Sequence, residues 1–476
     1  MNANLTAKIL PLMLILCLTF CAMGPAAAAG PEILAQGDCG DSATWALDSA
    51  GTLTISGSWR MKDYDTDGRV PWYPERESVK RIIVEPGITT VGKHAFHGCV
   101  NATSVSLPDS LQKIEQYAFS DCEKLKELRI PDSVSSMGYW AFARCSALKS
   151  ITFSARLASI PMQAFMRCES LETLALPDTM ESLDSRAFED CSKLKSVDLG
   201  NGVTSIGENA FKGCWRLQTV TAGNGLERIG KMAFNGCWQL KTVTVGNHLQ
   251  TIQDNAFNGC EALTEIVLPG SLSSLGSGVL NGHLTDVWFG GTEKQWNDLL
   301  NNTGANWNND ELKRANIHFA VILYYDANGG GGSMTPTVLE PGGEGILPEN
   351  GFTPPAGMIF SGWLCDGKAY QPGDSLKAES GTTVTAQWVE KAPGLEDLTL
   401  DGSKVTVAAS APENAAVWCA VYDADGRMLE VRRPDAAAQG TLLRFTFSPG
   451  FASAKAFLLD ADCIPLCGCA ESEEGR

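Results

Sequence analysis

Eight of the sixteen cysteines in this chain recur at one fixed spacing, and they are the first residues to test for chemistry. They lie 23 residues apart: Cys99, Cys122, Cys145, Cys168, Cys191, Cys214, Cys237 and Cys260. Stacked repeats would bring neighbouring cysteines to about 4.8 Å, which is within reach of a disulfide. A thiol at a strictly repeated interior position instead acts as a small hydrophobe. We favour buried free thiols, although an oxidising compartment would favour disulfides.

The remaining candidate reactive groups do not form a catalytic or metal-binding pattern. His94 and His97 are three residues apart, but their rows hold Tyr, Trp, Ser and Ala in other repeats, so we expect ordinary surface residues. Cys463, Cys467 and Cys469 cluster without a histidine; a local disulfide or free thiols fit better than zinc, whose sites normally show two spaced ligand pairs. No nucleophile motif accompanies the five histidines. We therefore expect no enzyme activity, no cofactor and no metal.

The cysteines end a longer repeated pattern, Ala-Phe-x-x-Cys, as in Ala118-Phe119-Ser120-Asp121-Cys122. An apolar residue, usually Leu, follows three positions later, and alternating apolar residues after it indicate one short strand per repeat. A second apolar position follows a Pro-Asp or Gly-Asn turn, and it is filled by Ile114, Met137, Ile160, Leu183, Ile206, Ile229 and Ile252. A fixed period of this length is typical of a stacked repeat architecture.

One repeat has too little apolar surface to fold alone, so neighbours must stack and bury a continuous column of Leu, Ile, Phe and Cys. The sequence therefore predicts a mainly β protein built on a solenoid of 23-residue repeats. We expect Phe119, Phe142 and Phe165 to be buried and aligned. Val279 and Leu280 replace the Ala-Phe pair at the end of the series, as in a capping repeat.

The row directly after the cysteines is mostly polar, but it holds Trp215 and Trp238 in consecutive repeats. We expect these two side chains to be exposed and adjacent, and exposed Trp pairs are good anchors for a protein partner or for sugar rings. Arg216, Lys212 and Gln239 would supply polar contacts. The alternative is that flanking modules fold back and bury the pair.

A second aromatic group, Tyr117, Tyr139 and Trp140, is weaker evidence of the same kind. Strand residues that alternate with the buried ones, such as Ser150 and Thr152, should form a flat face rich in Ser and Thr. This face fits a solubilising surface as well as it fits a ligand site.

The array resembles the BspA-like leucine-rich repeats of bacterial surface proteins. Its pattern L-x-x-V-x-L-P…I-G-x-x-A-F-x-x-C covers roughly residues 76–290. Two alternating strands around a turn, from Cys39 to Gly57, look like the leader that commonly precedes such arrays, and the segment from Val287 to Trp296 looks like the usual cap. The resemblance implies contact with proteins of a host or of neighbouring cells.

Two further modules follow the array. The segment that opens at Tyr324 and closes at Trp388 resembles the Listeria-Bacteroides repeat, the internalin B-type module, and this resemblance implies a small β-grasp-like domain. Short apolar strands after Pro393 predict an immunoglobulin-like or fibronectin III-like β-sandwich.

The N-terminus has the order of a secretory signal peptide: Lys8, an apolar run of about a dozen residues, and a small-residue site ending near Ala29. A lipoprotein signal at Cys21 would need a small preceding residue, and Phe20 is bulky. The expected domains are a signal peptide at 1–29, a β leader at 30–75, the solenoid at 76–290, its cap at 291–320, the Listeria-Bacteroides module at 321–390 and the β-sandwich at 393–476.

The net charge of -18 disfavours nucleic acid as a partner, since such binders carry a basic face. After the signal peptide, no segment approaches the roughly 20 apolar residues of a membrane span. We expect a secreted or loosely attached cell-surface protein that binds a macromolecule through its solenoid. A carbohydrate-binding accessory module that uses the Trp pair is the alternative, and a hydrolase is the least favoured class. The ligand and the oligomeric state do not follow from the sequence.

Overall fold

The structure, a computed structural model, describes residues 31–281, 283–301, 309–391, 394–401, 404–410, 416–423, 427–432, 442–447, 453–459 and 470–473. The chain divides into two compact units, one ending at Ala320 and one beginning at Val321. The predicted signal peptide at 1–29 and the cluster of Cys463, Cys467 and Cys469 lie outside the described residues.

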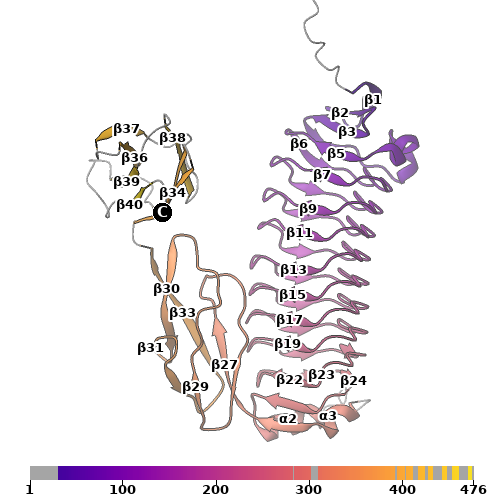
Figure 1. The fold of residues 1–476 in the computed structure, drawn as a ribbon. Helices are drawn as coiled ribbons and strands as arrows, with labels where there is room; N and C mark the ends of the chain where they lie inside the picture. Colours follow the sequence, from indigo (N-terminus) through magenta and orange to yellow (C-terminus); the bar gives the residue numbers. More distant parts are fainter. Residues whose placement is uncertain are drawn as a thin grey trace, which may run out of the picture. The chain divides into compact units, whose positions relative to one another are not determined.

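The first unit is the predicted solenoid, in which each repeat adds one parallel strand of three or four residues to a row that divides into several short sheets (Figure 1). The register is that of the 23-residue period, because Thr173 pairs with Ser196, and Ser196 with Thr219. The strands along this side are β5 (Arg81–Val84), β7 (Ser104–Ser106), β9 (Glu127–Arg129), β11 (Ser150–Thr152), β13 (Thr173–Ala175), β15 (Ser196–Asp198), β17 (Thr219–Thr221), β19 (Thr242–Thr244) and β22 (Glu265–Leu268). The expected fold class and the strand in each repeat are confirmed.

A second row of parallel strands, not predicted from the sequence and called here the second sheet, runs along the solenoid and divides into two hydrogen-bonded parts. Its two-residue strands end at the second apolar position of each repeat, and Leu183 pairs in register with Ile206. A polar-apolar dipeptide is too short to show alternation, so its strand character was not visible. The strands are β6 (Ile88–Val91), β8 (Lys113–Ile114), β10 (Ser136–Met137), β12 (Ser159–Ile160), β14 (Ser182–Leu183), β16 (Ser205–Ile206), β18 (Arg228–Ile229), β20 (Thr251–Ile252) and β23 (Ser274–Leu275).

A column of phenylalanine rings forms the centre of the solenoid. Phe119, Phe142 and Phe165 are fully buried, as expected. Their ring centroids are 5.0 and 5.4 Å apart, and the rings are parallel within 3°. The same stacking continues to Phe257, where the last pair of rings is 5.2 Å apart. Offset stacking and removal from water both stabilise such a column of aromatic rings.

The repeat cysteines are free and buried, so the preference for free thiols over disulfides is confirmed. Each Sγ from Cys122 to Cys260 donates a hydrogen bond to a phenylalanine carbonyl; Cys168 Sγ, for example, lies 3.3 Å from the carbonyl oxygen of Phe142. Burial raises the pKa of Cys99 and Cys260 to about 12. The thiols of this column are therefore protonated and unreactive at neutral pH.

The N-terminal end of the solenoid is closed by an antiparallel hairpin and a tryptophan. Strands β1 (Ile33–Asp38), β2 (Ala43–Asp48) and β3 (Thr52–Gly57) pair in order, and β3 then pairs in parallel with β5. The buried ring of Trp72 stacks 5.8 Å from Phe96 and continues the phenylalanine column. Its Nε1 donates a hydrogen bond to the carbonyl oxygen of Ala95 at 2.9 Å.

The C-terminal end is closed by two more parallel strands, β25 (Asp286–Phe289) and β26 (Asn316–Phe319), with helices α2 (Glu293–Asn301) and α3 (Asp310–Arg314) between them. Asn309 is fully buried at this end of the solenoid, and its side chain makes two hydrogen bonds of 2.8 Å. Its Oδ1 accepts from the backbone N–H of Val279, and its Nδ2 donates to the carbonyl oxygen of Gly276. Val279 and Leu280 are buried, whereas His283 is exposed.

The first part of the second unit is a mixed five-stranded sheet in the order β28-β27-β33-β30-β31. Its central strands β27 (Val321–Asp326) and β33 (Thr382–Glu390) are parallel, and the buried Trp363 of β30 (Met358–Cys365) lies 5.4 Å from Tyr325. The edge strands are β28 (Thr337–Leu339) and β31 (Lys368–Tyr370), and β29 (Glu344–Ile346) pairs with β32 (Ser375–Lys377). The identification as a Listeria-Bacteroides module stays a prediction.

The described residues in the rest of the second unit form two antiparallel sheets, as a β-sandwich requires. One sheet contains β34 (Gly394–Asp401), β35 (Lys404–Ser410) and β38 (Leu442–Thr446), and the other contains β36 (Ala416–Tyr422), β37 (Met428–Arg432), β39 (Ser453–Leu459) and β40 (Ala470–Glu473). Val405 and Phe445 from the first sheet and Cys419 from the second are buried. The immunoglobulin-like or fibronectin III-like assignment remains an expectation.

Candidate binding surface

Trp215 and Trp238 form an exposed pair on the solenoid. Half of each side chain is accessible, 50% and 54%, in a molecule whose other large apolar repeat residues are mostly buried. The two rings stack with centroids 5.8 Å apart and planes within 11° of parallel. The structure therefore places the pair as the sequence suggested, exposed and adjacent, while the role of the pair in binding remains to be tested.

The turn that presents the pair has the same backbone in each repeat. The residue two positions before each Trp is in the left-handed region, at φ 74° for Gly213 and 75° for Gly236. Asp121 and Arg144 take nearly the same backbone angle in their repeats, although side chains are disfavoured there. Since other repeats carry Glu or Ser at the Trp position, the fold does not require an aromatic residue in this row.

The stacking decides which parts of the rings a ligand can reach. Parallel rings at this distance partly cover one face of each other and leave their edges and two outer faces accessible. The neighbouring members of the same row are Ser192 and Glu261. The pair does not offer two coplanar faces, which a flat sugar-binding platform needs.

The three polar residues expected beside the pair differ in how accessible their side chains are to a ligand. Arg216 and Gln239 are exposed next to the rings. Lys212 is half-buried, and its Nζ lies 3.3 Å from Glu189 Oε1 on the adjacent repeat. The charge of Lys212 is therefore partly neutralised, and Arg216 is the better placed cation.

The second aromatic group is larger than expected, because His94 belongs to it. His94, Tyr117 and Trp140 occupy one row and stack at 4.8 and 5.7 Å. Tyr139 is 39% exposed and packs edge-on against Tyr117 at 6.1 Å. This group precedes the Ala-Phe pair in each repeat, whereas the Trp pair follows the cysteine, so the structure does not bring the two groups together. The 23-residue spacing of His94 from Tyr117 was the signal that could have revealed it.

His97 takes part in a small charged network rather than a metal site. Its Nε2 lies 3.3 Å from Asp121 Oδ2, and Arg144 lies 3.5 Å from the other carboxylate oxygen. Burial alone would raise the pKa of the Asp121 carboxyl, but the hydrogen bonds from His97 and Ser120 and the charge of Arg144 together lower it. Across the described residues, no group of three or more His, Cys, Asp or Glu side chains is close enough to hold a metal ion.

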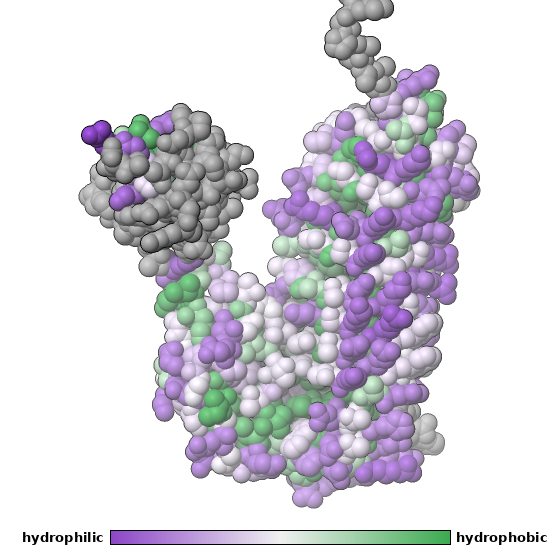
Figure 2. All heavy atoms as spheres, viewed as in Figure 1, coloured by the Kyte–Doolittle hydropathy of each residue, from purple (hydrophilic) through white to green (hydrophobic). Residues whose placement is uncertain are grey.

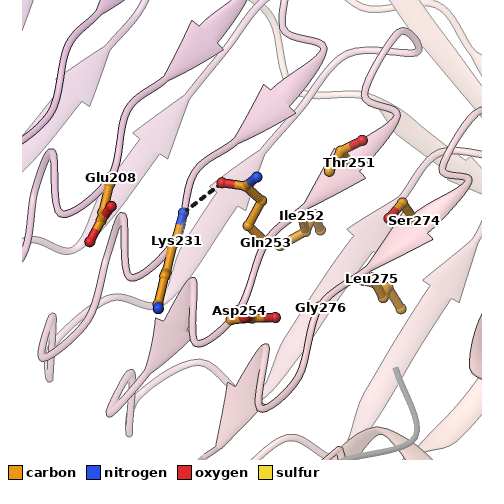
Figure 3. A pocket seen from close by; sticks show the side chains of 9 residues that line it. All are labelled: Glu208, Lys231, Thr251, Ile252, Gln253, Asp254, Ser274, Leu275 and Gly276. Carbon is orange, nitrogen blue, oxygen red and sulfur yellow. Dashed lines mark hydrogen bonds between the residues drawn. The ribbon is translucent and has the colours of Figure 1, made fainter. Parts of the chain in front are cut away.

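A polar groove of about 480 Å³ lies beside the second sheet, lined by β20, β23 and residues that follow the strands of this sheet. Figure 3 shows Lys231 between Glu208 and Gln253, with the backbone N–H of Lys231 donating to Gln253 Oε1 at 3.1 Å. None of the nine residues that line the groove is aromatic. No repeated sequence signal marks this surface, and it provides a reference face for experiments on the Trp pair.

One family model and several solved structures are similar to parts of this chain. Residues 73–195 and 158–285 match the family described as BspA type leucine rich repeat region, in six copies. Solved structures that resemble this chain include a leucine-rich repeat protein from Eubacterium ventriosum, with 21% identity over 53% of this chain and 95% of that one, at a TM-score of 0.33. A T. pallidum leucine-rich repeat protein has 29% identity over 43% and 91% of the two chains, at a TM-score of 0.33.

A leucine-rich cell surface protein from Faecalibacterium prausnitzii has 20% identity over 58% of this chain and all of its own, at a TM-score of 0.28. No curated protein matches the chain. Within the part of the chain that the structure describes, no helix has the length and apolar character needed to cross a membrane.

Proposed function

Because the solenoid is a BspA-type leucine-rich repeat region, we propose that this chain is a secreted or cell-surface adhesion protein that binds a protein of a host or of a neighbouring cell. The exposed Trp215–Trp238 pair carries the proposal, because the fold buries nearly every other large apolar side chain of the repeats. The signal-peptide pattern at residues 1–29 supports an extracellular location.

The pair has the properties of an interface anchor. Trp is the residue type most enriched among side chains that dominate protein–protein binding energy. The two rings are fixed by their mutual stacking and by a turn whose backbone repeats along a rigid rod. A partner would therefore lose little freedom of the Trp side chains on binding, which favours affinity.

The ring geometry favours a protein partner over a glycan. A sugar ring packs its flat face on an exposed aromatic face, and here one face of each ring is partly covered by the other ring. The indole edges and the exposed Arg216 instead suit apolar and polar groups from a protein surface. Binding of a glycan remains an outcome that the same experiment detects.

The test compares three forms of the full chain on immobilised extracellular-matrix proteins and on a glycan array. We expect the unchanged chain to bind at least one matrix protein, and Trp215→Ala/Trp238→Ala to weaken that binding by about 30-fold, since removing an anchor of this kind costs about 2 kcal/mol or more. Trp59→Ala is the control, because Trp59 is 72% exposed in the same unit and far along the chain from the pair.

Two results would contradict the proposal. Equal binding by the unchanged chain and the double variant would remove the pair from the interface. Binding to glycans alone, lost in the double variant, would replace the protein partner with a carbohydrate.

A further inference from the structure

Two rows of exposed residues just before the strands of the first sheet carry positive charge on an otherwise acidic chain. The rows are positions 124, 147, 170, 193, 216 and 239, and positions 126, 149, 172, 195, 218 and 241. Their cations, named here the basic strip, are Lys124, Lys126, Lys149, Lys193, Lys195, Arg216 and Lys241. Glu172 is the one carboxylate in these rows, so seven cations and one anion give a net charge of +6, against -18 for the chain.

Stacking places the basic strip on one edge of the solenoid. The backbone N–H of Gln218 donates to the carbonyl of Lys195 at 2.8 Å, and that of Lys241 donates to the carbonyl of Gln218 at 2.9 Å. Successive members of a row are therefore about one strand spacing apart, roughly 4.8 Å. Figure 2 shows a hydrophilic band that runs along the solenoid in this view.

The carboxylate of Glu172 lies among the lysine side chains of the basic strip. Its carboxylate accepts a hydrogen bond from Lys195 Nζ at 2.7 Å. That hydrogen bond and the charge of Lys195, followed by the charges of Lys149 and Lys193, lower the pKa of Glu172. One carboxylate thus lies among three ammonium groups, and it can neutralise only one of them.

The basic strip is least neutralised beside the Trp pair. The turns 192–195, 215–218 and 238–241 contain Lys193, Lys195, Arg216 and Lys241 and no carboxylate. The neighbouring row does carry Glu123, Glu169 and Glu261, but these lie in other turns. Among the described residues, Arg216 and Lys241 form no ion pair within 4 Å. Both side chains are exposed, so both charges are available to a partner.

We propose that the basic strip receives an acidic segment of the protein that the Trp pair anchors. This inference rests on the proposed function and adds the chemistry of the partner to it. Complementary charge around an apolar anchor speeds association and excludes partners of the wrong sign. An acidic protein segment fits better than an anionic glycan, because the stacked rings next to the strip partly cover one face of each other and do not form one continuous flat platform.

The test measures binding of the full chain to immobilised poly-L-glutamate in about 50 mM and about 300 mM NaCl. The key variant is Arg216→Glu/Lys241→Glu. Its matched control, Arg228→Glu/Lys231→Glu, reverses one exposed Arg and one exposed Lys in a single repeat of the same array, on and beside the second sheet. We expect the key variant to weaken binding by about tenfold or more, the control to change it by less than about twofold, and the higher salt to weaken binding by the unchanged chain.

Failure of this proposal is distinguishable from failure of the proposed function. Polyglutamate offers no apolar group to the Trp pair, so Trp215→Ala/Trp238→Ala should bind it like the unchanged chain. Absence of polyglutamate binding at low salt, or an equal loss in the key variant and its control, would overturn the basic strip as a binding surface. Binding of heparin without binding of polyglutamate would assign the strip to a sulfated glycan and overturn the acidic protein segment.

Discussion

Raising the pH above about 9 is expected to unfold the solenoid steeply, because its buried repeat thiols can ionise only in the unfolded chain. Their pKa values rise on folding from the ordinary value of 9.0, to about 12 for Cys99 and Cys260, with burial as the main cause. The folded state therefore holds these protons more tightly, so the stabilisation is complete below pH 9 and is lost between pH 9 and the folded pKa.

The expected effect is large because the titrations add. Each buried thiol lowers the free energy of unfolding by roughly 1 kcal/mol per pH unit in this window, so eight lower it by on the order of 10 kcal/mol per unit. A typical domain is stable by about 5–15 kcal/mol, and the solenoid should therefore unfold within about one or two pH units. Urea midpoints measured by circular dichroism between about pH 7 and pH 10.5, with a reductant present, would show the fall.

A variant isolates the thiols from the lysines and tyrosines that also titrate at high pH. Cys145→Ala/Cys168→Ala/Cys191→Ala removes three of the eight repeat thiols. Its stability at pH 7 will be lower because alanine leaves cavities, but its stability should fall less steeply with pH, by about three eighths. Identical slopes for the two proteins would show that the thiols do not cause the alkaline unfolding.

Phe165→Ala is expected to be the most damaging single truncation tested in the solenoid. The Phe165 ring stacks at 5.4 Å on both Phe142 and Phe188 and meets Phe153 edge-on at 5.6 Å. Truncating a fully buried Phe costs about 3–5 kcal/mol. In a solenoid, a central repeat also transmits that loss to the interfaces on both sides.

Urea unfolding at pH 7 measures this cost, and Trp215→Ala provides the contrast. Trp215 is a larger aromatic residue in the same array, but half of it is exposed, so its truncation should cost less than about 1 kcal/mol. If both substitutions lowered the free energy of unfolding equally, the phenylalanine column would not be the structural core.

The parts of the fold that could be predicted from the sequence are those whose residue pattern recurs in every repeat. The position of Phe165 or Cys168 is fixed by eight registers without insertion, so burial and stacking followed from the period. Trp72 and Asn309 occur once, at the two ends, where the sequence leaves the repeat pattern. Such a residue does not recur every 23 residues, so the sequence pattern does not identify it. Its role becomes visible only in the structure, where it covers the terminal ring of the phenylalanine column or the last repeat.

The candidate surface was partly predictable for the same reason. The row of Trp215 is polar elsewhere, which predicted exposure, but the parallel stacking of the two rings depends on side-chain torsions that spacing does not specify. The residue expected at His94 was an ordinary surface residue; it stacks instead on Tyr117, and its 23-residue spacing from Tyr117 was the one sign of this. The basic strip was not predicted because an overall charge of -18 conceals a local net charge of +6.

The central claim, that the Trp pair is the contact site, is tested most directly by hydrogen–deuterium exchange of the full chain with and without a bound matrix protein. We predict slower exchange in the turns 212–218 and 235–241 and unchanged exchange in the segments 251–254 and 274–276, which line the groove beside the second sheet. Protection confined to other turns, with the turns of Trp215 and Trp238 exchanging as in the free chain, would contradict it.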